Sequence, residues 1–311
     1  MNRRALLTLL PAVALAPVAA RAQPSSKPPF DPRLTPARPD LAAKHLEGRV
    51  TAARFVEGRV HEVVAGCAPV RKAPAADAEM LTEALAGERV TVYDLGEDGF
   101  AWGQLAADGY VGYVPATALG PPGPPPTHRV TVPRTHVLPA PSVRRPPLDW
   151  LPFGSRVAVL RTDGTFAVTA AGGFVPLAHL APVAADETDP VAVAEKFLGA
   201  PYLWGGKTVA GLDCSGLVQV AFAACGIACP RDTDMQEKTL GRRLDGPSDL
   251  DALHRGDLVF WKGHVAMVRD RTTLLHANAH HMAVATEPVA EAVARIAATG
   301  AGQVVAVRRF A

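Results

Sequence analysis

Cysteine is scarce in this sequence: 311 residues contain four, which are Cys67, Cys214, Cys225 and Cys229. So few cysteines exclude a scaffold built on disulfides in a chain of this length. They also form no zinc-type spacing with the ten histidines. Cys225 and Cys229 lie around the end of an expected apolar helix, where we favour core packing but leave a disulfide bridge open.

Charge of one sign does not gather in any stretch of the chain. The 32 Lys and Arg residues nearly balance the 30 Asp and Glu residues, and no basic block resembles a nucleic-acid-binding stripe. After the N-terminus there is no second long apolar run. We therefore expect neither a nucleic-acid partner nor a membrane span.

The first 22 residues have the pattern of an export signal. Met1-Asn-Arg-Arg4 is a charged start, residues 5–19 are apolar, and Ala20-Arg21-Ala22 is a small-x-small cleavage site. We predict removal of residues 1–22 and a periplasmic or extracellular location. The Arg3-Arg4 pair also admits the twin-arginine route, so the export route stays open.

Composition then divides the remaining chain into an arm and three folded parts. Residues 23–58 predict an extended arm, because residues 23–45 are rich in proline and have few apolar side chains, with a short helix at 39–47 as an option. Residues 59–120 alternate short apolar runs with turn residues, which predicts a small barrel. After a Pro/Gly linker, residues 127–184 repeat these phrases in degraded form and predict a second barrel.

Residues 187–311 predict an α+β domain with its helices on one side of an antiparallel sheet. Helices are expected at 191–198 and 214–225, separated by loops that include a polar one through 231–236. The expected strands are 257–261, 264–268, 274–279, 282–286 and 304–310.

Cys214 is predicted to be the first residue of the second helix. The N–H groups and positive dipole at a helix N-terminus stabilise a thiolate, which is the nucleophilic form of cysteine. The alternative interpretation of Cys214 is a small, buried apolar side chain without a chemical role. A catalytic thiol also needs a histidine to take its proton and a third group to orient that histidine.

His264 and His276 are predicted to supply those two groups. If Val268 faces Thr272 across a three-residue loop, the hairpin register places His264 directly opposite His276. Their Cβ atoms would be about 5 Å apart on one face, close enough for the rings to hydrogen-bond. A one-residue slip would send the two rings to opposite faces, so the prediction depends on the loop length.

Six separated phrases now agree with one known family. They are Tyr202-Leu-Trp-Gly-Gly, Asp213-Cys-Ser-Gly-Leu217, Pro230-Arg-Asp232, Gly256-Asp-Leu-Val-Phe260, His264-Val and His276-Ala. This order over residues 190–290 resembles the NlpC family of papain-like cysteine peptidases, which cut bacterial cell-wall peptides. The two expected barrels resemble bacterial SH3-like domains. The resemblance implies a papain-like catalytic domain preceded by two small all-β barrels.

The resemblance also implies the roles of three residues. Cys214 is the nucleophile, His264 the general base and later acid, and His276 the polar residue that orients the base. It implies no metal and no cofactor, and we expect a monomer.

Relatives with tandem barrels imply a murein stem peptide as substrate, cut between γ-D-glutamate and the diamino acid when the N-terminal L-alanine is free. By that similarity Glu83, Tyr110 and Asp213 hold the alanine ammonium, while Tyr202, Trp204, Ser215, Asp232 and Thr233 shape the glutamate side of the pocket. Other interpretations stay open: Glu83 as a solvated acid, Tyr110 as a barrel aromatic, Asp213 as a helix cap, and Trp204 and Trp261 as core aromatics.

Three other functions also stay open at this point. One is an endopeptidase that cuts D-alanyl-diaminopimelate crosslinks in intact sacculi. Another is a non-catalytic wall-binding protein, for which Cys214 would be an unreactive core thiol. A lipid acyltransferase is possible for the fold, but the wall-type barrels do not support it.

Overall fold

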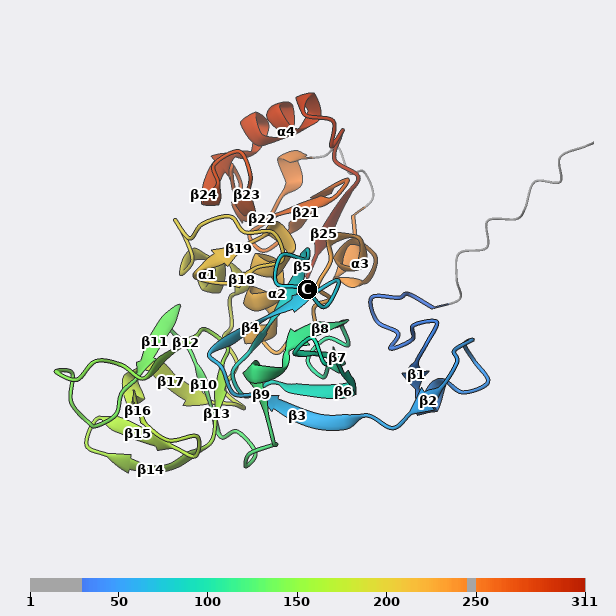
Figure 1. The fold of residues 1–311 in the computed structure, drawn as a ribbon. Coiled ribbons are helices and arrows are strands. Elements are labelled where there is room, and N and C mark those ends of the chain that lie inside the picture. Colours follow the sequence, from blue (N-terminus) through green and yellow to red (C-terminus); the bar gives the residue numbers. More distant parts are fainter. Residues whose placement is uncertain (1–29, 245–249, 311) are drawn as a thin grey trace, which may run out of the picture. The chain divides into compact units, whose positions relative to one another are not determined.

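The structure is a computed structural model that describes residues 30–244 and 250–310 (Figure 1). The chain divides into two units, residues 1–31 and residues 32–311, and the following description concerns the second. The predicted export signal lies outside the described residues. Among those residues, no helix is both long enough and apolar enough to cross a membrane.

Residues 32–58 form a packed arm. It contains the short parallel strands β1 (Ala42–Ala43) and β2 (Phe55–Val56), and the optional helix is only a 3-10 turn, η1 (Lys44–Leu46). Leu41 is fully buried in a cluster with Trp102 and Val111, and the Arg38 guanidinium lies 4.5 Å from the centroid of the Trp102 ring. The arm is therefore anchored to the β structure that follows.

The first β unit is one antiparallel sheet in the order β5-β4-β8-β7-β6-β3-β9. Its alternating side chains fill a core that includes Val63, Val70, Val90 and Leu105. The elements are β3 (Arg59–Val63), β4 (Cys67–Arg71), β5 (Met80–Leu85), β6 (Arg89–Leu95), β7 (Phe100–Leu105), β8 (Val111–Pro115), η2 (Ala116–Ala118) and β9 (Leu119–Gly120).

The second β unit repeats this pairing pattern with shorter strands. In the first unit β3 pairs with both β6 and β9, and in the second β10 pairs with both β13 and β17. In each unit a 3-10 turn follows the aromatic-Val-Pro phrase. The elements are β10 (His128–Val130), β11 (Arg134–Val137), β12 (Asp149–Pro152), β13 (Arg156–Val157), β14 (Val159–Asp163), β15 (Phe166–Thr169), β16 (Phe174–Pro176), η3 (Leu177–His179) and β17 (Leu180–Pro182).

The C-terminal domain has mixed helix and strand content, as predicted. Its main sheet has the order β20-β25-β21-β22-β23-β24. The elements are α1 (Pro190–Glu195), β18 (Lys207–Thr208), β19 (Gly211–Leu212), α2 (Cys214–Ala224), α3 (Thr233–Thr239), β20 (Arg242–Arg243), η4 (Leu250–Ala252), β21 (Leu258–Trp261), β22 (His264–Asp270), β23 (Thr273–Asn278), β24 (Ala283–Pro288), α4 (Val289–Ala298) and β25 (Ala306–Arg309).

Helices cover both faces of this sheet, so the prediction that they lie on one side is wrong. Leu258, Phe260 and Val265 pack with α1 and α2, whereas Val259, Ala266 and Val268 pack with α4. Successive residues of a strand point to opposite faces of the sheet. The continuous apolar runs of β21 and β22 therefore contribute side chains to two cores, one on each face. The polar loop expected at 231–236 is also interrupted by α3, which begins at Thr233.

Candidate active site

Cys214 is the first residue of α2, as the sequence predicts. Asp213 has an extended backbone and caps the helix by accepting a hydrogen bond from the Gly216 N–H at 2.7 Å. A Cβ on Gly216 would collide with the carbonyl oxygen of Gly206, so glycine permits the approach of the preceding loop. The Cys214 side chain is held at a capped, buried helix start, with 7% of the residue exposed.

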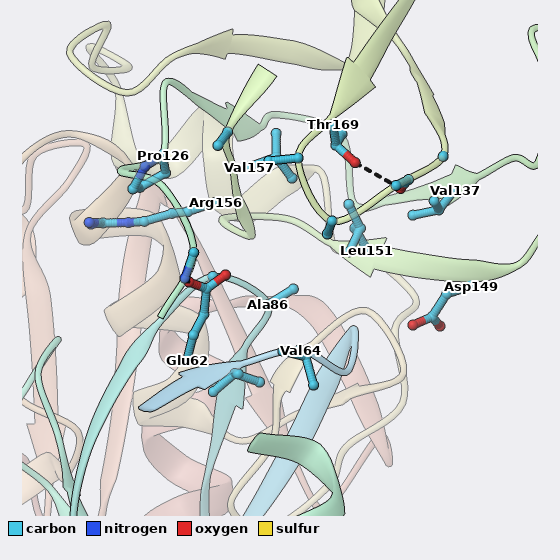
Figure 2. Close-up of a pocket in the computed structure, with 18 of the residues that line it drawn as sticks. Glu62, Val64, Ala86, Pro126, Val137, Asp149, Leu151, Arg156, Val157 and Thr169 are labelled. Atoms are coloured by element: carbon cyan, nitrogen blue, oxygen red, sulfur yellow. Dashed lines mark hydrogen bonds between the residues drawn. The ribbon is translucent and has the colours of Figure 1, made fainter. Parts of the chain in front are cut away.

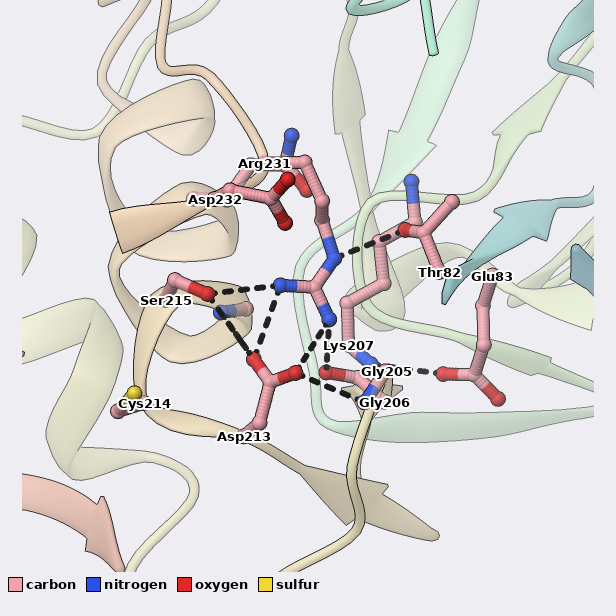
Figure 3. Close-up of polar contacts among 12 residues, drawn as sticks. Thr82, Glu83, Gly205, Gly206, Lys207, Asp213, Cys214, Ser215, Arg231 and Asp232 are labelled. Atoms are coloured by element: carbon pink, nitrogen blue, oxygen red, sulfur yellow. Dashed lines mark hydrogen bonds and ion pairs between the residues drawn. The ribbon is translucent and has the colours of Figure 1, made fainter. Parts of the chain in front are cut away.

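Arg231 is the centre of the polar network around Asp213 (Figure 3). Its Nη1 and Nη2 donate to the two carboxylate oxygens of Asp213 at 2.9 and 2.7 Å, and Nη1 also donates to Ser215 Oγ at 2.9 Å. Arg231 is 1% exposed, so this is a buried bidentate ion pair. Asp213 is therefore neutralised within the protein, and Ser215 belongs to the same network.

The same guanidinium reaches the first β unit. Arg231 Nε donates to Thr82 Oγ1 at 2.9 Å, and the adjacent Glu83 accepts a hydrogen bond from the Lys207 backbone N–H at 2.7 Å (Figure 3). Glu83 is 8% exposed, so the interpretation of it as a solvated acid is wrong. The β unit thus contacts the loop that leads to Cys214.

Tyr110 supplies a second contact between the β unit and the C-terminal domain. Its hydroxyl donates to Asp232 Oδ2 at 2.9 Å, and Arg33 of the arm donates to the same oxygen at 2.7 Å. The next residue, Thr233, places its Oγ1 3.9 Å from the Cys214 sulfur. Tyr110 therefore bonds to Asp232, the residue that directly precedes a neighbour of the thiol in the sequence.

His264 and His276 come together, although not in the predicted register. Their rings are joined by a hydrogen bond of 2.9 Å between His264 Nε2 and His276 Nδ1. The ladder pairs Met267 with Leu275, two residues away from the predicted alignment, because a bulge separates Val268 from Asp270. A two-residue shift keeps both rings on the same face, so the pair is diagonal rather than directly opposed.

Two residues that the sequence interpretation missed extend this histidine pair. His276 Nε2 lies 3.1 Å from Glu287 Oε2, and Glu287 accepts from Arg295 Nε and Nη2 at 2.8 and 2.7 Å. His276 is 1% exposed and Glu287 is 7% exposed. This series of contacts therefore links four elements: β22 with His264, β23 with His276, β24 with Glu287 and α4 with Arg295.

Two family models match the chain in the regions that build this site. Residues 199–302 match the NlpC/P60 family, and residues 70–119 match the bacterial dipeptidyl-peptidase Sh3 domain. Residues 199–302 form an NlpC/P60 domain. The first β unit is accordingly a bacterial SH3 domain, as the sequence predicts.

Known relatives match shorter stretches. Dipeptidyl-peptidase 6 of Lysinibacillus sphaericus is 35% identical over 88 residues, which are 28% of this chain and 31% of that protein. A gamma-D-glutamyl-L-lysine dipeptidyl-peptidase of Bacillus cereus is 32% identical over 134 residues, 40% of this chain and 36% of that protein. The chain thus spans about a third of the length of these relatives.

The fold has a solved counterpart. An NlpC/P60 family protein from Bacillus cereus aligns with a TM-score of 0.67 at 19% identity, covering 81% of this chain and 99% of that one. The similarity extends beyond the NlpC/P60 domain and identifies the fold.

Burial favours the neutral forms of the Cys214 thiol and of the His264 and His276 rings. Burial, followed by the charge of Asp213, raises the pKa of Cys214 to about 11. Burial lowers the pKa of His264 to about 3 and that of His276 to about 4. Desolvation of the sulfur therefore exceeds the stabilisation that the helix N-terminus and the nearby donors give to a thiolate.

Alkylation of Cys214 should accordingly follow the thiolate fraction over a wide pH range. We expect the iodoacetamide rate at Cys214 to rise about tenfold per pH unit from pH 7 to 10. N-acetylcysteine in the same tube should level off above about pH 9. Site-resolved mass spectrometry separates Cys214 from the other thiols, and a rate at Cys214 that is already constant below pH 8 would contradict the neutral pair.

Tyr202 and Trp204 lie on the loop that precedes Cys214. Tyr202 is half-buried against the core, and burial together with the neighbouring Cys214 raises its pKa to about 12. Trp204 is 61% exposed, so the interpretation of it as a core aromatic is wrong, whereas Trp261 is 1% exposed and is a core residue. Trp204 therefore presents its indole to solvent beside the approach to Cys214.

A separate pocket of about 410 Å³ lies between the SH3 domain and the second β unit (Figure 2). Val64, Ala86, Leu151 and Val157 are among its apolar lining residues. Glu62 also lines it but is engaged by Arg89 and by the Gly123 N–H. None of the three predicted catalytic residues lines this pocket, so it is distinct from the candidate active site.

Proposed function

We propose that this chain is a cysteine peptidase that hydrolyses the γ-D-glutamyl to diamino-acid bond of murein stem peptides with a free N-terminal L-alanine, in cell-wall turnover or recycling. The observation that supports the proposal most strongly is the helix start that carries Cys214, which shares the Arg231 network with the SH3 domain, in the same domain as the hydrogen-bonded pair His264 and His276. The name of the Bacillus cereus relative, a gamma-D-glutamyl-L-lysine dipeptidyl-peptidase, supports the substrate class.

In the proposed reaction Cys214 attacks the scissile carbonyl. His264 takes the thiol proton as the sulfur–carbon bond forms, and then gives that proton to the departing amine as the carbon–nitrogen bond breaks. Water, deprotonated by His264, hydrolyses the thioester and restores the thiol. The backbone N–H of Cys214, at the start of α2, is available to stabilise the oxyanion.

Within residues 30–244 and 250–310, no hydrogen bond joins the Cys214 thiol to the His264 ring. The Val265 backbone N–H, next to His264, donates to the Cys214 sulfur and favours its ionised form. Catalytic hydrogen bonds are often loose without substrate and tighten in the complex. Binding of the peptide is the step that would bring His264 onto the thiol.

Of the three candidates for binding the alanine ammonium, Glu83 is the best suited. Asp213 forms an ion pair with Arg231, and the Tyr110 hydroxyl donates a hydrogen bond to Asp232, so both groups already have partners. Glu83 is buried, and within residues 30–244 and 250–310 no lysine or arginine forms an ion pair with it. A buried carboxylate without a cationic partner is a favourable site for an ammonium group.

Glu83→Gln should therefore weaken cleavage of peptides with a free amine. We expect kcat/KM for L-Ala-γ-D-Glu-diaminopimelate to fall about 10- to 100-fold, the value of one charge-assisted contact. The N-acetylated peptide should be a poor substrate for both proteins and should show little further loss. Chromatography of the released diamino acid measures both reactions.

Glu88→Gln is the matched control for this experiment. Glu88 is also a largely buried acid of the SH3 domain, and it lies 3.5 Å from Lys207 Nζ. Its replacement should leave the preference for the free amine intact.

Two results would change the proposed substrate. Equal cleavage of the free and N-acetylated peptides by the parent protein would disprove recognition of the amine. Faster digestion of crosslinked sacculi than of soluble peptide would favour the crosslink endopeptidase.

We infer three further properties of the whole protein. The repeated strand pairing of residues 127–184 supports a second SH3-like barrel. The N-terminal pattern supports export to the periplasm or the exterior, and a soluble monomer is sufficient for the site because both catalytic histidines and the thiol come from one chain. N-terminal sequencing of the secreted protein tests cleavage after Ala22, and sedimentation tests the monomer.

A further inference from the structure

We propose that Glu287 is a positioning residue that fixes the proton arrangement of both active-site histidines and leaves His264 Nδ1 unprotonated as the base. The proposal rests on the peptidase chemistry inferred above. It goes beyond that chemistry by assigning a role to a residue on β24 that contacts neither the thiol nor His264 in the described structure. Its basis is the unbroken series of contacts His264, His276, Glu287, Arg295.

The carboxylate determines the direction of every hydrogen bond in this series. Ionised Glu287 can only accept, so the 3.1 Å contact requires a proton on His276 Nε2. A neutral His276 then has a bare Nδ1, which accepts from His264 Nε2–H across 2.9 Å. A neutral His264 that carries its proton on Nε2 has a bare Nδ1, and this nitrogen is the one left to accept the Cys214 proton.

Arg295 keeps Glu287 in the form that this argument needs. Its two donors bind both carboxylate oxygens at 2.8 and 2.7 Å. The Arg295 guanidinium holds the pKa of Glu287 below its usual value, so the carboxylate is ionised at neutral pH. His276 is hydrogen-bonded to His264 and Glu287, and Arg295 and His281 lie near enough to influence its ring.

The carboxylate should also help after the proton has moved. When His264 takes the thiol proton, positive charge develops on the histidine pair in a buried environment. A fixed carboxylate next to His276 stabilises that charge, whereas a neutral amide does not. Loss of Glu287 therefore affects both the tautomer and the transition state.

Glu287→Gln tests the proposal with little change in side-chain volume. An amide can accept from Nε2–H through its oxygen or donate to bare Nε2 through its NH₂ group, so it permits both tautomers of His276. We expect kcat on the stem peptide to fall about 10- to 100-fold. Long-range ¹H–¹⁵N spectra of histidine-labelled protein should show Nε2-protonated rings in the parent and a mixture of tautomers in the variant.

Asp257→Asn is the matched control, and Glu287→Asp is the conservative variant. Asp257 is 1% exposed and its two carboxylate oxygens accept from Arg309 at 2.8 and 2.6 Å, without a contact to His264 or His276. Its replacement should lower the thermal midpoint without changing kcat or the spectra of His264 and His276. Glu287→Asp keeps an acceptor-only group and should retain the parent tautomers and more activity than Glu287→Gln.

Two results would overturn the proposal. One is a kcat for Glu287→Gln no lower than that of Asp257→Asn. The other is a loss of activity in Glu287→Gln while both rings stay in the single Nε2-protonated form. If the parent protein cleaves no stem peptide, the proposed function fails, and the spectra alone still decide whether Glu287 sets the tautomers.

Discussion

Cys214→Ala should abolish cleavage of the stem peptide, with a loss of at least about 10⁴-fold in kcat/KM. Within the described chain, Cys214 is the one cysteine at the start of a capped helix. Alanine removes the only atom that can form the acyl-enzyme and leaves the backbone N–H groups in place. Release of the diamino acid, followed over hours at high enzyme concentration, measures the residual rate.

The same substitution should change the fold very little. The Sγ atom is small, and its removal from a site that is 7% exposed should cost about 1 kcal/mol or less of unfolding free energy. Cys225→Ala is the matched control, because Cys225 is a free thiol at the other end of α2. Activity of Cys214→Ala close to that of Cys225→Ala would reject the cysteine mechanism and favour the non-catalytic wall-binding protein.

The residues around the thiol were predictable because their signals are local. A glycine-rich approach, an N-cap aspartate and an apolar run define the start of α2, and the structure confirms Cys214 as its first residue. The hydrogen bond between His264 and His276 is confirmed as well. The exact pairing was not predictable, because the bulge next to Asp270 changes the register without a distinctive residue pattern.

The partners of these residues come from distant parts of the chain and have no local signal. Arg231 bonds to Thr82, 149 positions earlier, and Tyr110 bonds to Asp232, 122 positions later. Glu287 is an unremarkable acid at the end of a strand until α4 brings Arg295 onto it. Such contacts depend on how the SH3 and NlpC/P60 domains pack, which periodicity within either domain does not determine.

Arg231→Met should be the most destabilising single substitution near the site. It leaves the Asp213 carboxylate buried without its cation and Thr82 Oγ1 without its donor. Breaking a buried pair by removing one partner typically costs about 3–5 kcal/mol, because the remaining charge is not compensated. Urea unfolding measures this loss, and Arg309→Met, which breaks a pair away from the thiol, is the control for the effect on activity.

A double variant separates the charge from the fold. The double variant Asp213→Asn/Arg231→Met leaves no uncompensated charge. Its loss of unfolding free energy should therefore be smaller than the sum of the losses in the two single variants. Activity should not recover in parallel, since Asp213 also caps the helix that carries Cys214 and accepts from the Gly205 N–H. Additive losses of stability would show that Arg231 acts by filling space, and full activity in Arg231→Met would show that the nucleophile does not depend on this network.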